Sequence, residues 1–167
     1  DVPVLGGSSI LKKIYQQGIK LAVNAVGGIG NINSRLRVFE LLTEAGFSIP
    51  SVIHPKAFCE PSASVSVGAQ VFAHAYVGSS CRVGLGCIIN TGAIISHDCL
   101  VGNYSNISPG AILAGGVVIG EKVLVGMGVT INLNVRVGAG ARIGNGATVK
   151  ADVPPGAVVK AGMIWPG

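Results

Sequence analysis

Residues 83–107 have the sequence VGLGCIINTGAIISHDCLVGNYSNI, in which an aliphatic residue recurs at every sixth position. The full series comprises Val65, Val71, Val77, Val83, Ile89, Ile95, Val101, Ile107, Leu113, Ile119, Val125, Ile131, Val137, Ile143 and Val149. Four residues later in each repeat stands a small or slim residue, such as Ala93 or Cys99. This spacing fits neither a helix, with about 3.6 residues per turn, nor a strand, with a period of about 2, and it therefore indicates a repeat architecture.

Each six-residue repeat predicts one short strand followed by a turn. Glycine often follows the aliphatic residue directly, as at Gly102, and relieves steric limits where the chain must bend. Three repeats close a triangular coil of about 18 residues, and successive coils stack as parallel strands about 4.8 Å apart. The aliphatic residues then fill the inside of a prism, and the small residues fit its corners. The predicted fold class is mainly β, a parallel β-helix of hexapeptide repeats.

Composition agrees with such a prism. The 167-residue chain is 49% hydrophobic but only 5% aromatic, as expected of a core of valine, isoleucine and alanine. The net charge is +5, and the repeats hold too few charges to form a nucleic-acid-binding stripe. That charge suits a small polyphosphate ligand such as coenzyme A, although ordinary surface charge equally explains any single lysine. The sequence predicts neither a transmembrane helix nor a signal peptide.

The four cysteines show no metal-binding spacing. Cys59 falls on the aliphatic phase of the repeat, whereas Cys81, Cys87 and Cys99 fall on the small-residue phase. All four are therefore predicted to be buried as small hydrophobic side chains. Cys81 and Cys99 should stack in neighbouring coils, but their parallel side-chain directions are poor for a disulfide. We expect reduced thiols in a cytoplasmic protein.

Residues 1–50 do not follow the repeat and predict a small, partial Rossmann-like α/β unit ahead of a β-helix domain at residues 51–167. The predicted elements are a short strand at Val2–Leu5, a helix from Ser8 or Ser9 to Gln17, a buried strand at Ile19–Val26 and a helix from Asn33 or Ser34 to Ala45. The segment Gly28-Ile29-Gly30 lacks the third glycine of a dinucleotide fingerprint, so a plain turn is the favoured interpretation.

The three histidines are too far apart in sequence for a zinc site, and no metal is expected. We expect His54 to lie in the linker and His74 to face solvent. His97 differs because Asp98 follows it, and Asp98 is the only aspartate between residues 65 and 149. An imidazole beside a carboxylate can act as a general base near neutral pH. The alternative is a solvent-facing histidine with an unrelated aspartate beside it.

The run IINTGAIISHDC at residues 88–99 is similar to the catalytic segment of the sialic acid O-acetyltransferase-like family of hexapeptide-repeat acyltransferases. This family includes bacterial UDP-amino-sugar N-acetyltransferases. By that resemblance His97 is the general base, and Asp98 orients or polarises it. Asn90 would help to fix the site. Gly115, one coil later, would leave room for the acyl group and offer its N–H to the oxyanion.

The same resemblance implies a left-handed coil, acetyl-CoA as co-substrate and a homotrimer with coenzyme A in the groove between two prisms. The implied coenzyme A contacts are Gly115, Gly116, Met127, Asn145 and Lys150. The stretch Val4-Leu5-Gly6-Gly7 also resembles that family's N-terminal domain. The family normally begins earlier, with a strand and a glycine-rich turn, so the α/β unit is expected to be truncated.

We therefore expect an acetyl-CoA-dependent acetyltransferase that acts by direct transfer on an amine or hydroxyl of a small-molecule acceptor, a nucleotide-linked sugar. Two alternatives remain open. One is O-acetylation of serine or another small acceptor, which the α/β character of residues 1–50 weakens. The other is a non-catalytic structural β-helix, which the His97–Asp98 pair and Gly115 oppose.

Overall fold

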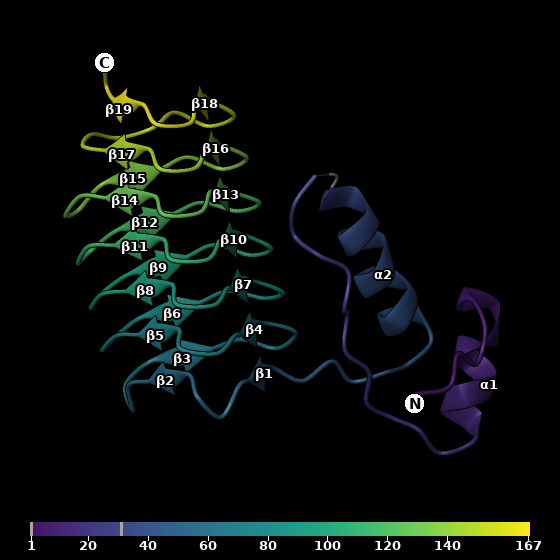
Figure 1. The fold of residues 1–167 in the computed structure, drawn as a ribbon. Helices are drawn as coiled ribbons and strands as arrows, with labels where there is room; N and C mark the ends of the chain where they lie inside the picture. Colours follow the sequence, from purple (N-terminus) through teal and green to yellow (C-terminus); the bar gives the residue numbers. More distant parts are fainter. Residues whose placement is uncertain (1, 31) are drawn as a thin grey trace. The chain divides into compact units, whose positions relative to one another are not determined.

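A computed structural model describes residues 2–30 and 32–167 (Figure 1). The chain divides into two compact units, residues 1–50 and residues 51–167. The second unit contains the nineteen strands β1–β19, each two residues long. Every helix within the described residues is too short or too polar to cross a bilayer.

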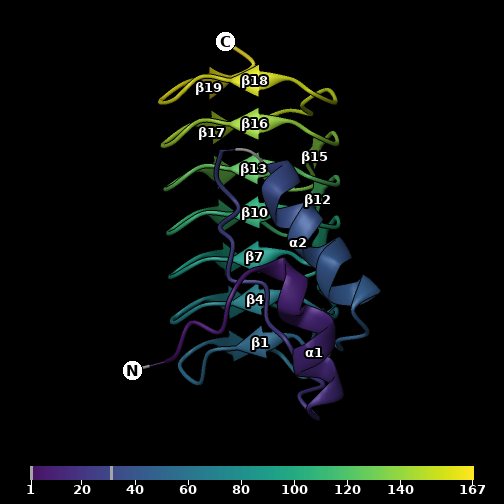
Figure 2. The same ribbon diagram turned by 90° about the vertical axis from the view of Figure 1, so that its right-hand side faces the viewer.

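The strands of the second unit form three parallel sheets, which are the faces of a prism. The first sheet, seen as one column in Figure 2, contains β1 (Val52–Ile53), β4 (Gln70–Val71), β7 (Ile88–Ile89), β10 (Asn106–Ile107), β13 (Leu124–Val125), β16 (Arg142–Ile143) and β18 (Val158–Val159). The second contains β2 (Phe58–Cys59), β5 (Tyr76–Val77), β8 (Ile94–Ile95), β11 (Ile112–Leu113), β14 (Thr130–Ile131), β17 (Thr148–Val149) and β19 (Ile164–Trp165). The third contains β3 (Ser64–Val65), β6 (Arg82–Val83), β9 (Leu100–Val101), β12 (Val118–Ile119) and β15 (Arg136–Val137). Each of the first five coils adds one strand to each sheet, which confirms the predicted parallel β-helix.

The pairing register places corresponding residues of successive coils side by side. Ile107, for example, pairs with Ile89 of the preceding coil and with Val125 of the following coil. Of the fifteen aliphatic residues in the series, all but Val65 are buried. Burial of each such side chain contributes about 1.5–3 kcal/mol, so this interior column is the main source of stability of the prism.

The glycines that follow aliphatic residues allow close approach between coils. A Cβ added to Gly102 would lie 2.5 Å from the carbonyl carbon of Gly120 in the next coil. A Cβ on Gly78 would lie 2.8 Å from the carbonyl carbon of Ser96. Backbone atoms cannot move aside as a flexible side chain can, so these positions require glycine.

The last coil is shorter than the others. Arg142 pairs with Val158 and Thr148 pairs with Ile164, whereas a full coil would bring their partners two positions later in the chain. On the third face, Val153 forms only a single bridge with Val137. Pro154 and Pro155 follow it and supply no N–H for a further strand. The third sheet therefore ends at β15.

The described part of residues 1–50 contains the 3₁₀ turn η1 (Ser8–Ile10), the helix α1 (Leu11–Gln16) and the helix α2 (Ile32–Glu44). Both predicted helices are confirmed, but their predicted N-terminal caps are not. No side chain caps η1 or α1, and α2 begins at Ile32, so Asn33 and Ser34 lie inside it. Helix α2 ends just before Gly46, which has a φ of +95° and suits a helix C-terminus. Phe39 and Leu42 form the buried face of α2.

The two predicted strands of this unit are not formed. Val2–Leu5 is exposed and irregular, and Ile19–Val26 makes only one bridge, between Leu21 and Ser48. A strand is stable only when neighbouring strands satisfy its backbone, and no such neighbours exist among residues 2–30 and 32–50. The apolar run Ile19–Val26 is accordingly largely exposed rather than buried.

All four cysteines are free. Cys81, Cys87 and Cys99 are buried as predicted, but Cys59 is only partly buried. Cys59 belongs to the first coil, so no coil covers it on one side. Burial raises the pKa of the Cys81 thiol and raises that of Cys99 to about 12.

We therefore expect slow labelling of the thiols under native conditions. A thiol reagent attacks the thiolate, and the raised pKa of Cys99 keeps that thiol protonated at neutral pH. At most Cys59 should react before unfolding, and all four should react in denaturant. Rapid native labelling of more than one thiol, measured by mass spectrometry, would contradict this packing.

Candidate functional site

The edge of the prism where the chain passes from the second sheet to the third carries His97, and we call it the His97 corner. Its two-residue turns stack coil on coil as Ser79-Ser80, His97-Asp98, Gly115-Gly116 and Leu133-Asn134. The backbone N–H of Asp98 donates to Ser79 O (2.9 Å), and that of Gly116 donates to His97 O (2.9 Å). These bonds between coils bring residues that are one full coil apart in sequence into contact.

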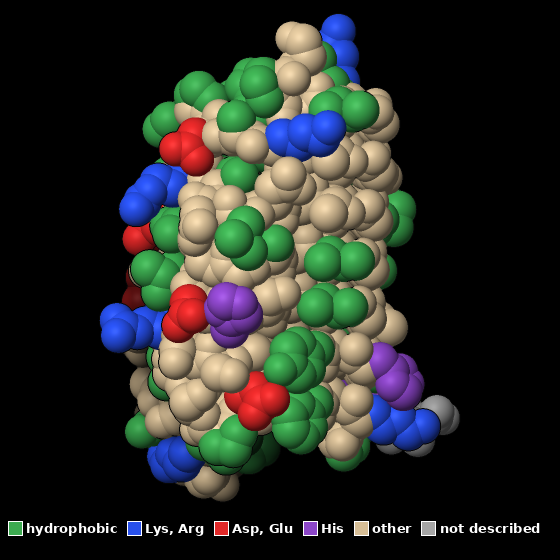
Figure 3. All heavy atoms as spheres, turned by 90° about the vertical axis from the view of Figure 1, so that its left-hand side faces the viewer, with side chains coloured by type: hydrophobic (Ala, Val, Ile, Leu, Met, Phe, Trp, Pro, Cys, Tyr) green, Lys and Arg blue, Asp and Glu red, His purple; other side chains and the backbone are tan. Residues whose placement is uncertain are grey.

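His97 and Asp98 form a pair at this corner. His97 Nδ1 lies 2.8 Å from Asp98 Oδ2, and both side chains are 64% exposed. An ionised carboxylate only accepts hydrogen bonds, so Nδ1 carries the proton and donates it. The lone pair of the ring is then on Nε2, which is the atom able to accept a proton from a substrate. Figure 3 shows a histidine directly beside an acidic side chain on this face of the molecule.

Gly115 lies against the His97 ring. A Cβ added to Gly115 would be 2.5 Å from His97 Cε1 and 2.6 Å from Nε2. Only glycine therefore fits here with the ring in this position. The N–H of Gly115 has no hydrogen-bond partner in residues 2–30 and 32–167, so it is available as a donor to a ligand. This is the arrangement that a general base and an oxyanion donor require.

Gly116 completes the turn with a φ of +69°. A Cβ at Gly116 would collide with Oδ1 of Asn134 in the next coil. The structure thus brings together four of the predicted site residues, namely His97, Asp98, Gly115 and Gly116.

Three other predicted residues lie elsewhere. Asn90, Met127 and Asn145 lie at the edge where the chain passes from the first sheet to the second, which we call the Met127 corner. The second sheet separates the two corners, so one prism cannot bring these residues to His97. Asn90 Oδ1 accepts the N–H of Thr91 (2.8 Å), and Asn145 Oδ1 accepts that of Met127 (2.9 Å). These amides stabilise turns, while the Met127 side chain is 49% exposed.

Lys150 lies at the His97 corner but far along it. It follows β17, three coils beyond Ser96, which follows β8. At about 4.8 Å per coil, this separation is about 14 Å along the prism axis. Its exposed ammonium could contact only a ligand that extends along the corner.

The remaining histidines form no constellation. His54 Nδ1 accepts the N–H of Lys56 (3.1 Å), and His74 is exposed with a φ of +60°. Within the described residues, no three His, Cys, Asp or Glu side chains cluster as a metal site. The His97 corner is thus the place where ionisable and backbone groups converge.

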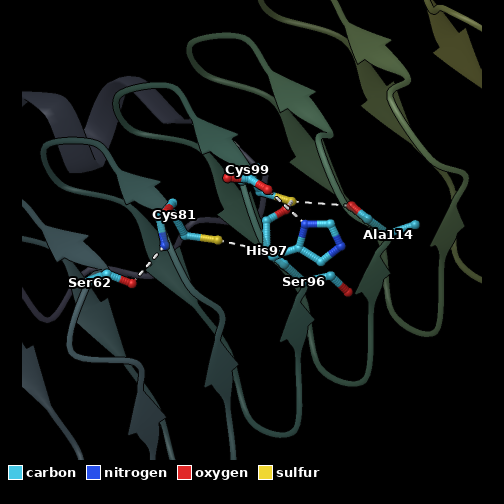
Figure 4. A network of polar contacts seen from close by, with 8 residues as sticks. Ser62, Cys81, Ser96, His97, Cys99 and Ala114 are labelled. Carbon is cyan, nitrogen blue, oxygen red and sulfur yellow. Dashed lines mark hydrogen bonds and ion pairs between the residues drawn. The ribbon is translucent and has the colours of Figure 1, made fainter.

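The sequence interpretation missed the polar role of the thiols beneath this corner. Cys81 and Cys99 were expected only to fill space, yet the Sγ atoms of both donate to backbone carbonyls beside His97 and Gly115, as Figure 4 shows. The available signal was the residue type, because cysteine and serine at the small-residue phase carry a donor that alanine and valine lack.

Comparison with known proteins agrees with this fold. The family model "Bacterial transferase hexapeptide (six repeats)" matches residues 116–151. No curated protein sequence matches the chain. PerB from Caulobacter crescentus, solved in complex with CoA and GDP-perosamine, has a TM-score of 0.91 at 32% identity, over 96% of this chain and 76% of that chain.

Two further structures are similar. The acetyltransferase domain of PglB from Neisseria gonorrhoeae, in complex with acetyl coenzyme A, has a TM-score of 0.88 at 35% identity, over 96% of this chain and 77% of that chain. WeeI from Acinetobacter baumannii has a TM-score of 0.68 at 26% identity, over 79% of this chain and 65% of that chain. On its fold, its repeats and these identities, the chain belongs to the left-handed β-helix family of hexapeptide-repeat acyltransferases that includes sugar N-acetyltransferases.

Proposed function

We propose that the protein is an acetyl-CoA-dependent acetyltransferase whose acceptor is an amine or hydroxyl of a nucleotide-linked sugar. The observation that carries the proposal is the His97 ring, paired with Asp98 and packed on Gly115. The ligands of PerB, CoA and GDP-perosamine, support this substrate class. Free thiols and an acetyl-CoA co-substrate favour a cytoplasmic protein.

Direct transfer needs one base and one oxyanion donor. His97 Nε2 accepts a proton as the acceptor nitrogen or oxygen attacks the thioester carbonyl carbon. The Gly115 N–H stabilises the resulting oxyanion. The carbon–sulfur bond then breaks, and the proton passes from Nε2 to the departing thiolate, which leaves as the free thiol. Asp98 holds Nδ1–H and stabilises the imidazolium in between.

The two corners suggest that one site takes residues from two chains. Asn90, Met127 and Asn145 can act with His97 only if a neighbouring prism supplies them. The second sheet also carries an outward-facing apolar column, Phe58, Tyr76, Ile94 and Ile112, which is visible as a line of hydrophobic side chains in Figure 3. Such a column on a surface favours contact with another protein chain.

We therefore expect a homotrimer. Light scattering should give three times the chain mass of 16.8 kDa. Asn145→Asp keeps the acceptor for the Met127 N–H but adds a charge that repels phosphate, so it should raise the KM for acetyl-CoA. At acetyl-CoA concentrations below the raised KM, mixing His97→Ala chains with Asn145→Asp chains should give more activity than either variant alone, because some sites then combine two intact corners. A monomer with full activity would contradict the shared site.

The proposed function is tested with acetyl-CoA and a panel of nucleotide-linked amino and hydroxy sugars. Acetyl-CoA should raise the melting temperature, because a ligand specific for the folded state stabilises it. Release of free coenzyme A thiol should depend on the acceptor. Desulfo-coenzyme A is the matched control, since it should bind but cannot donate an acetyl group. Absence of both a shift and turnover would favour a non-catalytic β-helix.

A further inference from the structure

A regular turn at the His97 corner is closed by a backbone hydrogen bond between its last and first residues. In a four-residue turn, the N–H of the fourth residue donates to the carbonyl of the first. This bond joins Cys81 N to Gly78 O (3.3 Å), over Ala63 of the preceding coil. It also joins Val135 N to Asn132 O (3.4 Å), over Val117. In both of these turns the side chain beneath has no hydrogen-bonding group, and the direct bond is present.

The two turns that carry the site lack the direct bond. No bond from Cys99 N to Ser96 O, or from Val117 N to Ala114 O, occurs in the described chain. Instead, Cys81 Sγ donates to Ser96 O (2.7 Å), and Cys99 Sγ donates to Ala114 O (3.2 Å). Figure 4 shows both contacts beside His97.

Backbone N–H groups near the sulfurs also affect the pKa of both thiols. After burial, which dominates and raises the pKa of both thiols, hydrogen bonds from backbone N–H groups lower it. The backbone donors are those of Cys99 and Gly78 for Cys81, and those of Val117 and Gly116 for Cys99. The hydrogen bonds place each sulfur against the carbonyl that begins a turn.

A hydroxyl at another corner bonds to both ends of the turn above it. Ser105 Oγ donates to Gly120 O (2.7 Å) and accepts the N–H of Val123 (3.0 Å). Cys87 lies at that same corner and donates to Gly102 O (3.1 Å), but the turn above it keeps its direct bond from Ser105 N to Gly102 O (3.3 Å). A buried thiol therefore replaces the direct hydrogen bond of the turn above it at some positions and not at others.

We propose that Cys81 and Cys99 are positioning residues, which hold open the turns bearing His97 and Gly115 and so set the contact between the imidazole and the Gly115 backbone. This inference rests on the proposed function. Because the ring lies against Gly115 with no room for a Cβ, closure of either turn by a direct bond would move one partner relative to the other. Cys99 contributes to the turn as a neutral donor and not as a nucleophile, since its side chain is fully buried.

The chain offers matched variants for a test. Cys99→Val fits sterically, because valine occupies the same corner one coil later at Val117, but it removes the donor. Cys99→Ser keeps a donor and an acceptor, as Ser105 shows. Cys87→Val removes a buried thiol that does not interrupt its turn. Cys81→Ala and Cys81→Ser repeat the comparison for the His97 turn, where Ala63 shows that alanine fits one coil earlier.

Cys99→Val should lower kcat about tenfold or more, as small misplacements of catalytic groups do, with the KM for acetyl-CoA nearly unchanged. Cys99→Ser and Cys87→Val should retain wild-type kcat. Adding Cys99→Val to His97→Ala should cause little further loss, because the thiol acts through the histidine contact. Equal kcat for Cys99→Val and wild type would overturn the proposal while leaving the proposed function intact.

A crystal structure distinguishes failure of this proposal from failure of the proposed function. In a crystal structure of Cys99→Val, a direct bond from Val117 N to Ala114 O should form, and Gly115 should shift relative to His97. In Cys99→Ser both should stay in place. If the turn is unchanged in Cys99→Val, the proposal is wrong even when no acceptor is ever found. If the turn closes but wild-type protein transfers no acetyl group, the proposed function fails, and the geometric part stands.

Discussion

His97→Ala should lower the rate of acetyl transfer by about 10²- to 10⁴-fold, the usual contribution of a general base. The loss should appear in kcat, while acetyl-CoA binding survives, because Nε2 is needed only for the proton. The side chain is 64% exposed and contributes little to the core, so the melting temperature should hardly change. Steady-state kinetics on an identified acceptor and a thermal melt measure both quantities.

His74→Ala is the matched control for this variant. His74 is also exposed and lies in a turn of the prism, but it has no acidic partner among the described residues. It should be close to wild type in both measurements. Wild-type turnover by His97→Ala would show that the proposed mechanism is wrong, and loss of folding would show that His97 is structural.

Gly115→Ala should lower kcat by about 10²-fold, the effect expected of displacing a catalytic group by about 1 Å. The new Cβ would meet Cε1 and Nε2 of His97 at 2.5 and 2.6 Å, so the ring must leave its place. The clash is with a side chain that can rotate, and the fold should therefore survive. In the double variant with His97→Ala the alanine should cost little more, because the ring is absent.

Gly102→Ala distinguishes a steric effect on the site from a general effect on the prism. There the added Cβ meets the backbone of Gly120 at 2.5 Å, and backbone packed between coils cannot rotate away. This variant should lose stability, whereas Gly115→Ala should lose activity. A large fall in melting temperature for Gly115→Ala would argue against the proposed contact with His97.

The prism could be predicted from sequence because its signal is repeated and local. The aliphatic residues from Val65 to Val149 occupy the second position of successive strands, and the pairing register follows from three repeats per coil. Every repeat buries one aliphatic residue in the same way, so each repeat supports the interpretation of the others. Cys59 departed from expectation only because burial at the end of a stack depends on the missing neighbour.

The absence of strands from the described part of residues 1–50 could not be predicted in this way. Ile19–Val26 has the apolar composition of a buried strand, but composition does not supply the partners that a strand needs. Its single bridge to Ser48 comes from a contact that no local pattern specifies. The shortened last coil likewise follows Pro154 and Pro155, which interrupt the repeat without stating by how much.

For the candidate site, spacing placed His97 and Gly115 in neighbouring coils, and the structure brings them together. The same spacing separates Asn90, Met127 and Asn145 from His97, because none of them lies a whole number of coils away, but the sequence interpretation did not use this signal. Spacing also did not show that two turns lack their direct hydrogen bond and instead accept a bond from a thiol, because the repeat specifies the position of a turn and not the hydrogen bonds within it.

Between β8 and β17 the register of successive coils is constant, which limits the spacing of groups that a ligand can meet. Positions along the His97 corner are available only at intervals of one coil, about 4.8 Å. Point substitutions can change the side chain that each coil presents at this corner, but they cannot change the spacing between coils. Only the gain or loss of a complete coil would move Lys150 nearer to His97 or farther away without disturbing the core. Under the proposed function, a ligand that reaches from His97 to Lys150 spans three of these intervals, about 14 Å.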